Sequence, residues 1–183
     1  MRFPDPAPSA ALLAGLALVL VSAAGADPAW QVFTPEDLSF RVELPASPTT
    51  ERKERWFPVS RFVSTVYKAR RGQNVFGVNH TDIPGAILFV VRKKTILETT
   101  RKGFLESSGA RKISFTPTQV DGRPAGELVY SIPATGERPK QRGTARMLFV
   151  GKRLFIFYTE LAGSTPEEES LRYFASIRIA EPE

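Results

Sequence analysis

One histidine and one nearby acid are the residues of this sequence whose types and spacing suggest acid–base chemistry. His80 is the single histidine of the 183-residue chain, and Asp82 follows two positions later. Side chains two apart on a strand point to the same side, so the imidazole and the carboxylate can meet, as in a general base oriented by an acid. A hydrolase would also need a nucleophile, and the sequence has no Gly-x-Ser-x-Gly elbow. We favour the alternative, a strand-end histidine that is hydrogen-bonded near a turn.

The composition excludes most other catalytic and metal chemistry. Cysteine is absent, which removes disulfides, thiolate metal sites and cysteine nucleophiles. One histidine cannot build a multi-histidine metal centre. No phosphate loop, calcium loop or dinucleotide-binding fingerprint occurs. We therefore expect no catalytic, cofactor-binding or metal-binding residues, and a protein that is not an enzyme.

Positive charge is distributed unevenly along the chain. The sequence has 25 Lys and Arg against 19 Asp and Glu, a formal net charge of +6. Residues 27–159 carry 22 basic and 12 acidic side chains, or +10, whereas residues 160–183 carry 2 and 6, or −4. Two basic clusters on one predicted helix are candidates for a basic contact surface. Their residues are Arg92, Lys93, Lys94, Arg101 and Lys102.

A basic surface attracts polyanions, which in an exported compartment are anionic lipids, envelope polymers or acidic proteins. Nucleic acid is not an expected partner there. The apolar residues 83–91 run directly into Arg92, Lys93 and Lys94, and this combination suits a membrane surface or a protein partner. Periodicity does not decide whether residues 83–91 form a buried strand, a buried helix start or an exposed apolar lip. The alternative for the clusters is a set of solvated charges that maintain solubility.

The N-terminal residues have the pattern of an export signal. Residues 10–21 are apolar, and Ala24 and Ala26 are the small residues that a signal peptidase requires before its cut. The apolar run is shorter than the about 20 residues that a spanning helix needs. We therefore expect residues 1–26 to be a cleaved signal peptide. Residues 27–183 are then one exported α+β domain, periplasmic or extracellular, with no transmembrane segment.

Hydrophobic periodicity predicts short strands, most of them paired in hairpins, and two helices. The expected strands are 38–44, 59–69, 75–81, 110–120, 125–132, 142–150, 153–160 and 177–179, and residues 46–55 are expected to form a loop. The expected helices are 92–108 and a second one beginning near Ser164, with Leu171, Phe174 and Ala175 buried. Hairpins produce antiparallel sheets, and each helix must bury one face. The sequence therefore predicts an α+β fold, a mainly antiparallel β-sheet with helices packed on it.

Three segments carry a resemblance to a known family. They are Trp30-x-x-Phe33 followed by residues 37–45, the turn segment 120–125 with Gly122-Arg123-Pro124 at its centre, and the closing segment 173–179. This pattern resembles small exported bacterial domains of the PsbP-like superfamily. The resemblance implies an α/β/α sandwich and functions of docking or assembly. It brings no catalytic motif and therefore no site residues, and a shared fold does not identify a function.

These observations lead us to expect an exported, non-catalytic envelope protein that docks an acidic partner or an anionic surface. One alternative is a small-molecule carrier with an apolar pocket. The other is a hydrolase that uses His80 and Asp82.

Overall fold

The computed structural model describes residues 29–57, 60–136, 138–163 and 167–181. The predicted signal peptide lies outside these ranges, as do Ser164 and Thr165 at the predicted start of the second helix. Among the described residues, no helix is long and apolar enough to cross a membrane.

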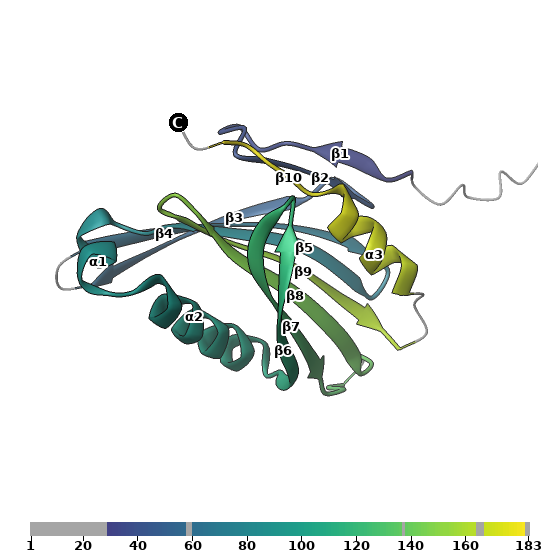
Figure 1. The fold of residues 1–183 in the computed structure, drawn as a ribbon. Helices are drawn as coiled ribbons and strands as arrows, with labels where there is room; N and C mark the ends of the chain where they lie inside the picture. The colour runs from purple at the N-terminus through teal and green to yellow at the C-terminus, as the bar shows by residue number, and fades with distance from the viewer. Residues whose placement is uncertain (1–28, 58–59, 137, 164–166, 182–183) are drawn as a thin grey trace, which may run out of the picture.

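A seven-stranded antiparallel sheet forms the centre of the molecule (Figure 1). Its strands are β3 (Thr49–Phe57), β4 (Ser60–Arg71), β5 (Asn74–Asp82), β6 (Arg111–Val120), β7 (Arg123–Ile132), β8 (Gln141–Val150) and β9 (Arg153–Ala162). They lie in the order β3-β4-β5-β9-β8-β7-β6. Every neighbouring pair is consecutive in the chain except β5 and β9, which join the two halves of the sheet. The predicted hairpins are confirmed.

One face of this sheet is covered by a three-stranded sheet and a helix, which form the upper layer in Figure 1. They consist of β1 (Gln31–Phe33), β2 (Phe40–Leu44), β10 (Arg178–Ile179) and α3 (Glu167–Ser176). Alternate residues of β2 point inward, and Phe40 packs in one core with Phe76 and Phe157 of the large sheet. Tyr173 of α3 is fully buried, and its hydroxyl donates to the Gly77 carbonyl at 2.6 Å.

The opposite face carries helix α2 (Lys93–Ser108), so helices lie on both faces of the sheet (Figure 1). Leu97, Phe104 and Leu105 of α2 pack on a second core. The ring of Phe104 meets the rings of Tyr130 and Tyr158 edge-on, at centroid distances of 5.4 and 5.6 Å. Both the predicted helix and the predicted α+β sandwich are confirmed.

The prediction of a loop over residues 46–55 is wrong, because most of this segment belongs to β3. Strand β3 is an edge strand that pairs only with β4, and residues 49–54 are exposed. An edge strand with no buried face needs no apolar alternation, and charged residues there discourage pairing with other chains. A search for apolar periodicity therefore does not identify this strand, because residues 49–54 are polar.

Two further details of the predicted core are wrong. Leu38 precedes β2 in a left-handed backbone conformation with φ of 52° and is 68% exposed, so the inward alternation begins only at Phe40. In α3, Leu171 and Ala175 are exposed, and the buried residues are Ser170, Tyr173 and Phe174. The buried hydroxyl of Ser170 is satisfied by a hydrogen bond of 2.9 Å with the hydroxyl of Thr159.

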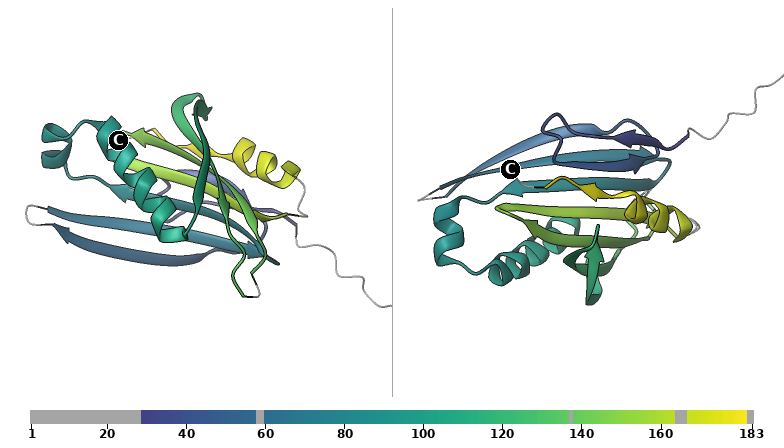
Figure 2. Two further views of the ribbon diagram at one scale, coloured as in Figure 1. Left: turned by 90° about the horizontal axis from the view of Figure 1, so that it is seen from below. Right: turned by 45° about the horizontal axis from the view of Figure 1, so that its top comes forward.

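Residues 83–91 form an exposed apolar lip, one of the three possibilities that the sequence left open. After the buried Ile83, the short helix α1 (Gly85–Val90) contains no buried residue. It lies at one end of the molecule, beyond the N-terminal end of α2 (Figure 2).

Two glycines in the large sheet allow tyrosine rings to lie directly on the backbone under α2. The ring of Tyr130 covers Gly143, and the ring of Tyr158 covers Gly77, at positions that a Cβ atom would occupy. The Phe104 contact with both rings therefore depends on these glycines.

We predict that Gly143→Ala destabilises the fold by about 2 kcal/mol, because the added methyl group overlaps the Tyr130 ring in a packed core. Gly103→Ala is the control, because a Cβ atom there meets nothing within 4 Å. It should stabilise the protein by about 0.8 kcal/mol through helix propensity. Urea unfolding of both variants measures the difference, and equal effects would contradict this account.

Candidate functional site

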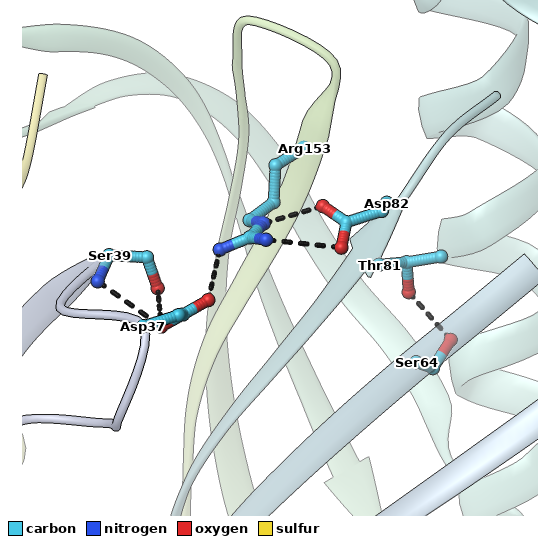
Figure 3. Close-up of polar contacts among 6 residues, drawn as sticks. All are labelled: Asp37, Ser39, Ser64, Thr81, Asp82 and Arg153. Carbon is cyan, nitrogen blue, oxygen red and sulfur yellow. Dashed lines mark hydrogen bonds and ion pairs between the residues drawn. The ribbon is translucent and has the colours of Figure 1, made fainter. Parts of the chain in front are cut away.

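Arg153 joins segments that are far apart in the sequence (Figure 3). Its guanidinium donates to both carboxylate oxygens of Asp82, with distances of 2.6 Å from Nε and 3.0 Å from Nη2. It also donates to Asp37, which in turn accepts hydrogen bonds of 3.2 and 2.8 Å from the backbone and hydroxyl of Ser39. We call Asp37, Asp82 and Arg153 the Arg153 clamp. It fixes the segment between β1 and β2 to the large sheet.

The contacts of the clamp favour its charged form. Burial alone would raise the pKa of Asp37, but hydrogen bonds from Ser39 and Arg153 outweigh this effect and lower the pKa. The hydrogen bonds to Asp82 are the main cause that raises the pKa of Arg153. The Asp82 carboxylate is thus bound by the guanidinium.

His80 lies beside the clamp on the same face of β5. It is 6% exposed, and neither ring nitrogen has a hydrogen-bond partner among the described residues. The imidazole stacks on Tyr67 with a centroid distance of 5.9 Å and an interplanar angle of 19°. Burial, and secondarily the charge of Arg153, lower its pKa, so the imidazole is neutral at pH 7.

The hydrogen bond between His80 and Asp82 that the hydrolase hypothesis requires is therefore not formed. The prediction that His80 is hydrogen-bonded near a turn is also wrong, because aromatic rings surround its imidazole. Phe40 and Phe155 lie 6.4 and 5.9 Å from its centroid.

An open cleft of 980 Å³ lies over this region. Phe33 and Tyr67, whose ring centroids are 5.1 Å apart, line it together with His80, and charged residues such as Arg52 and Lys152 also border it. Small-molecule sites commonly have volumes of about 300–1,000 Å³. This cleft is open and partly charged, and so differs from the enclosed apolar pocket expected of a carrier.

The predicted cations Arg92, Lys93 and Lys94 meet at the junction of α1 and α2. All three are exposed, and within the described ranges no carboxylate lies in ion-pair distance of them. The ammonium group of Lys93 lies 5.3 Å from the centroid of the Phe149 ring. Lys152, in the turn between β8 and β9, lies beside the other end of α1, because its ammonium is 3.7 Å from the Cβ position of Gly85. We call Arg92, Lys93, Lys94 and Lys152 the junction cations.

Apolar side chains adjoin the junction cations. Phe89 and Val90 of α1 are 91% and 73% exposed. A large exposed aromatic residue beside unpaired cations is unusual for a purely solvating surface, on which charges and small polar groups are expected.

Basic residues on β3 differ from the junction cations, because carboxylates neutralise them. Arg52 lies 3.7 Å from Glu54, and Lys53 lies 3.1 Å from Glu51. The two clusters are similar in sequence, but among the described residues Arg52 and Lys53 have carboxylate partners, whereas Arg92, Lys93 and Lys94 have none within ion-pair distance.

The structure separates Arg101 and Lys102 from the junction cations. The guanidinium of Arg101 lies 4.4 Å from the centroid of the Phe115 ring on β6, and Lys102 is 3.9 Å from Glu106. The five predicted contact residues are thus divided between two places, and only Arg92, Lys93 and Lys94 adjoin the exposed apolar residues.

Sequence reasoning did not identify the Arg153 clamp or the position of Lys152. Asp37 and Arg153 are 116 residues apart, and only the pairing of β5 with β9 brings Asp82 opposite Arg153. No local pattern in the sequence carries that information.

We predict that Phe in place of His80 changes the pH dependence of stability. The unfolded histidine has a pKa of about 6.5, and the folded one a lower pKa, so below about pH 6.5 the unfolded chain binds more protons and the native state loses stability. His80→Phe removes this loss, and its stability relative to the original protein should increase as the pH falls from about 7 to about 5, a range that spans the unfolded pKa of about 6.5. Urea unfolding across this range tests it, and a difference independent of pH would contradict it.

Comparisons with known proteins support the fold and leave the function open. No protein-family model matches the chain, and no curated protein matches it. The solution structure of cyanobacterial PsbP (CyanoP) from Synechocystis sp. PCC 6803 matches with a TM-score of 0.55 and 14% sequence identity. The match covers 89% of this chain and 99% of the cyanobacterial one. The chain therefore has the PsbP-like fold that its sequence pattern resembles.

Proposed function

We propose that this chain is an exported, non-catalytic envelope protein that docks on an anionic surface through the junction cations. The observation that carries the proposal is that four exposed cations flank α1 and its exposed apolar side chains. Among the described residues, no carboxylate lies within ion-pair distance of these cations. An uncompensated cluster of this kind attracts anionic groups, and the attraction decreases with salt.

Export is supported by the sequence of residues 1–26, which has the pattern of a cleaved signal. A docking role is supported by the PsbP-like fold, for which the resemblance implies assembly functions. The absence of catalysis is supported by the clamp, because the acid nearest in sequence to His80 is bound by Arg153.

A small-molecule carrier is the second candidate. The cleft over His80 is not the enclosed apolar pocket expected of a carrier, but its volume and its aromatic lining suit a small ligand. The cleft combines aromatic side chains with a buried imidazole that lacks hydrogen-bond partners within the described part of the chain. Native mass spectrometry of the purified protein tests this role, and a co-purified small molecule that is lost in His80→Phe would support it.

We predict that replacing Arg92, Lys93 and Lys94 with Gln weakens binding to anionic vesicles about a hundredfold, because each cation near such a surface contributes about 1 kcal/mol. The control replaces Arg52, Lys53 and Arg55 with Gln, which removes the same formal charge from β3. Sedimentation with vesicles and with cell-envelope fractions, at low and high ionic strength, measures both variants.

Equal losses in the two triple variants would mean that net charge alone drives binding and would contradict a specific surface. Failure of the original protein to bind either vesicles or envelope fractions at low ionic strength would overturn the proposed function.

A further inference from the structure

The tip of α1 presents apolar side chains that nothing in the described structure covers. Phe89 is 91% exposed, more than any other large hydrophobic side chain in the described part of the chain, and its neighbour Val90 is 73% exposed. Exposing this area to water is unfavourable, and the fold gains nothing from it. The tip therefore has the properties of a contact surface.

The backbone holds this tip firmly. The Ile83 side chain is buried, and its N–H donates to the carbonyl of Lys152 at 3.0 Å. Within α1, the carbonyl of Pro84 accepts from Ile87 at 2.9 Å, and the carbonyl of Ile87 accepts from Val91 at 2.7 Å. The tip thus needs little ordering when it binds, which lowers the entropic cost of binding.

The junction cations flank the apolar tip on both sides. Arg92, Lys93 and Lys94 follow Val90 within four residues, and Lys152 lies beside Gly85 at the beginning of α1. Because α1 lies at one end of the molecule (Figure 2), the tip can approach a flat surface. Such a surface can then receive the apolar side chains and the cations at the same time.

We propose that α1 inserts Phe89 and Val90 into the headgroup region of an anionic lipid bilayer while the junction cations contact lipid phosphates. This inference rests on the proposed docking function and names its partner. A stable protein interface buries about 800 Å² on each side, whereas the tip offers a six-residue helix. A bilayer accepts so small an element, because apolar insertion and attraction to anionic headgroups add together.

The first test replaces Phe89 with Ser. Its matched control is Leu171→Ser, which removes an exposed apolar side chain, 59% exposed, from α3 at the other end of the molecule (Figure 1). Phe89→Ser should weaken binding to vesicles of phosphatidylglycerol and phosphatidylcholine about tenfold. The control should leave it unchanged. Circular dichroism and thermal unfolding check that both variants remain folded, as their exposure leads us to expect.

The second test measures insertion directly. The chain contains no cysteine, so Phe89→Cys introduces a single site for an environment-sensitive NBD label, and Leu171→Cys provides the control site. With anionic vesicles, the label at residue 89 should shift its emission to shorter wavelength and be quenched by lipids that carry a spin label close to the headgroup. The label at residue 171 should do neither.

The outcomes separate this inference from the proposed function. Salt-sensitive vesicle binding with an unshifted label at residue 89 would overturn insertion and leave electrostatic docking intact. Salt-sensitive binding to envelope proteins, with none to vesicles, would overturn the lipid partner in favour of an acidic protein. Failure to bind either would overturn both proposals.

Discussion

The pairing of β5 with β9 is the interaction on which the rest of the structure depends. These strands join the two halves of the large sheet, and both are buried along most of their length. A strand buried on both faces requires a cover on each, and the small sheet with α3 supplies one and α2 the other. Helix α1 belongs to neither of these covering layers, and its apolar residues therefore remain available for another contact.

Local patterns were sufficient to predict the elements that bury one face next to a sharp turn. The hairpins and α2 belong to this class, and Gly109 ends α2 in a left-handed conformation, which glycine adopts readily. Strand β3 was missed because residues 49–54 of this edge strand are exposed and have no apolar period. Part of the buried face of α3 was misassigned, because Ser170 and Tyr173 pack inward and their hydroxyl groups find hydrogen-bond partners on distant residues, Thr159 and Gly77.

The candidate site shows the same division between local and distant information. Three of the junction cations follow one another in the sequence and were predicted, whereas Lys152 comes from a turn 58 positions after Lys94. Sequence likewise does not reveal that Glu51 and Glu54 neutralise the basic residues of β3. A cluster of basic residues in a sequence therefore indicates a contact surface only when the structure shows that no carboxylates lie nearby.

The acidic residues of α3 have a consequence for how the molecule would approach a surface. Glu167 and Glu168 are exposed at the end of the molecule opposite α1, and both belong to the acidic C-terminal stretch (Figure 1). These carboxylates therefore lie far from the junction cations. An anionic surface repels the carboxylates of α3 and attracts the junction cations, so an approach with α1 foremost is electrostatically favoured over an approach with α3 foremost.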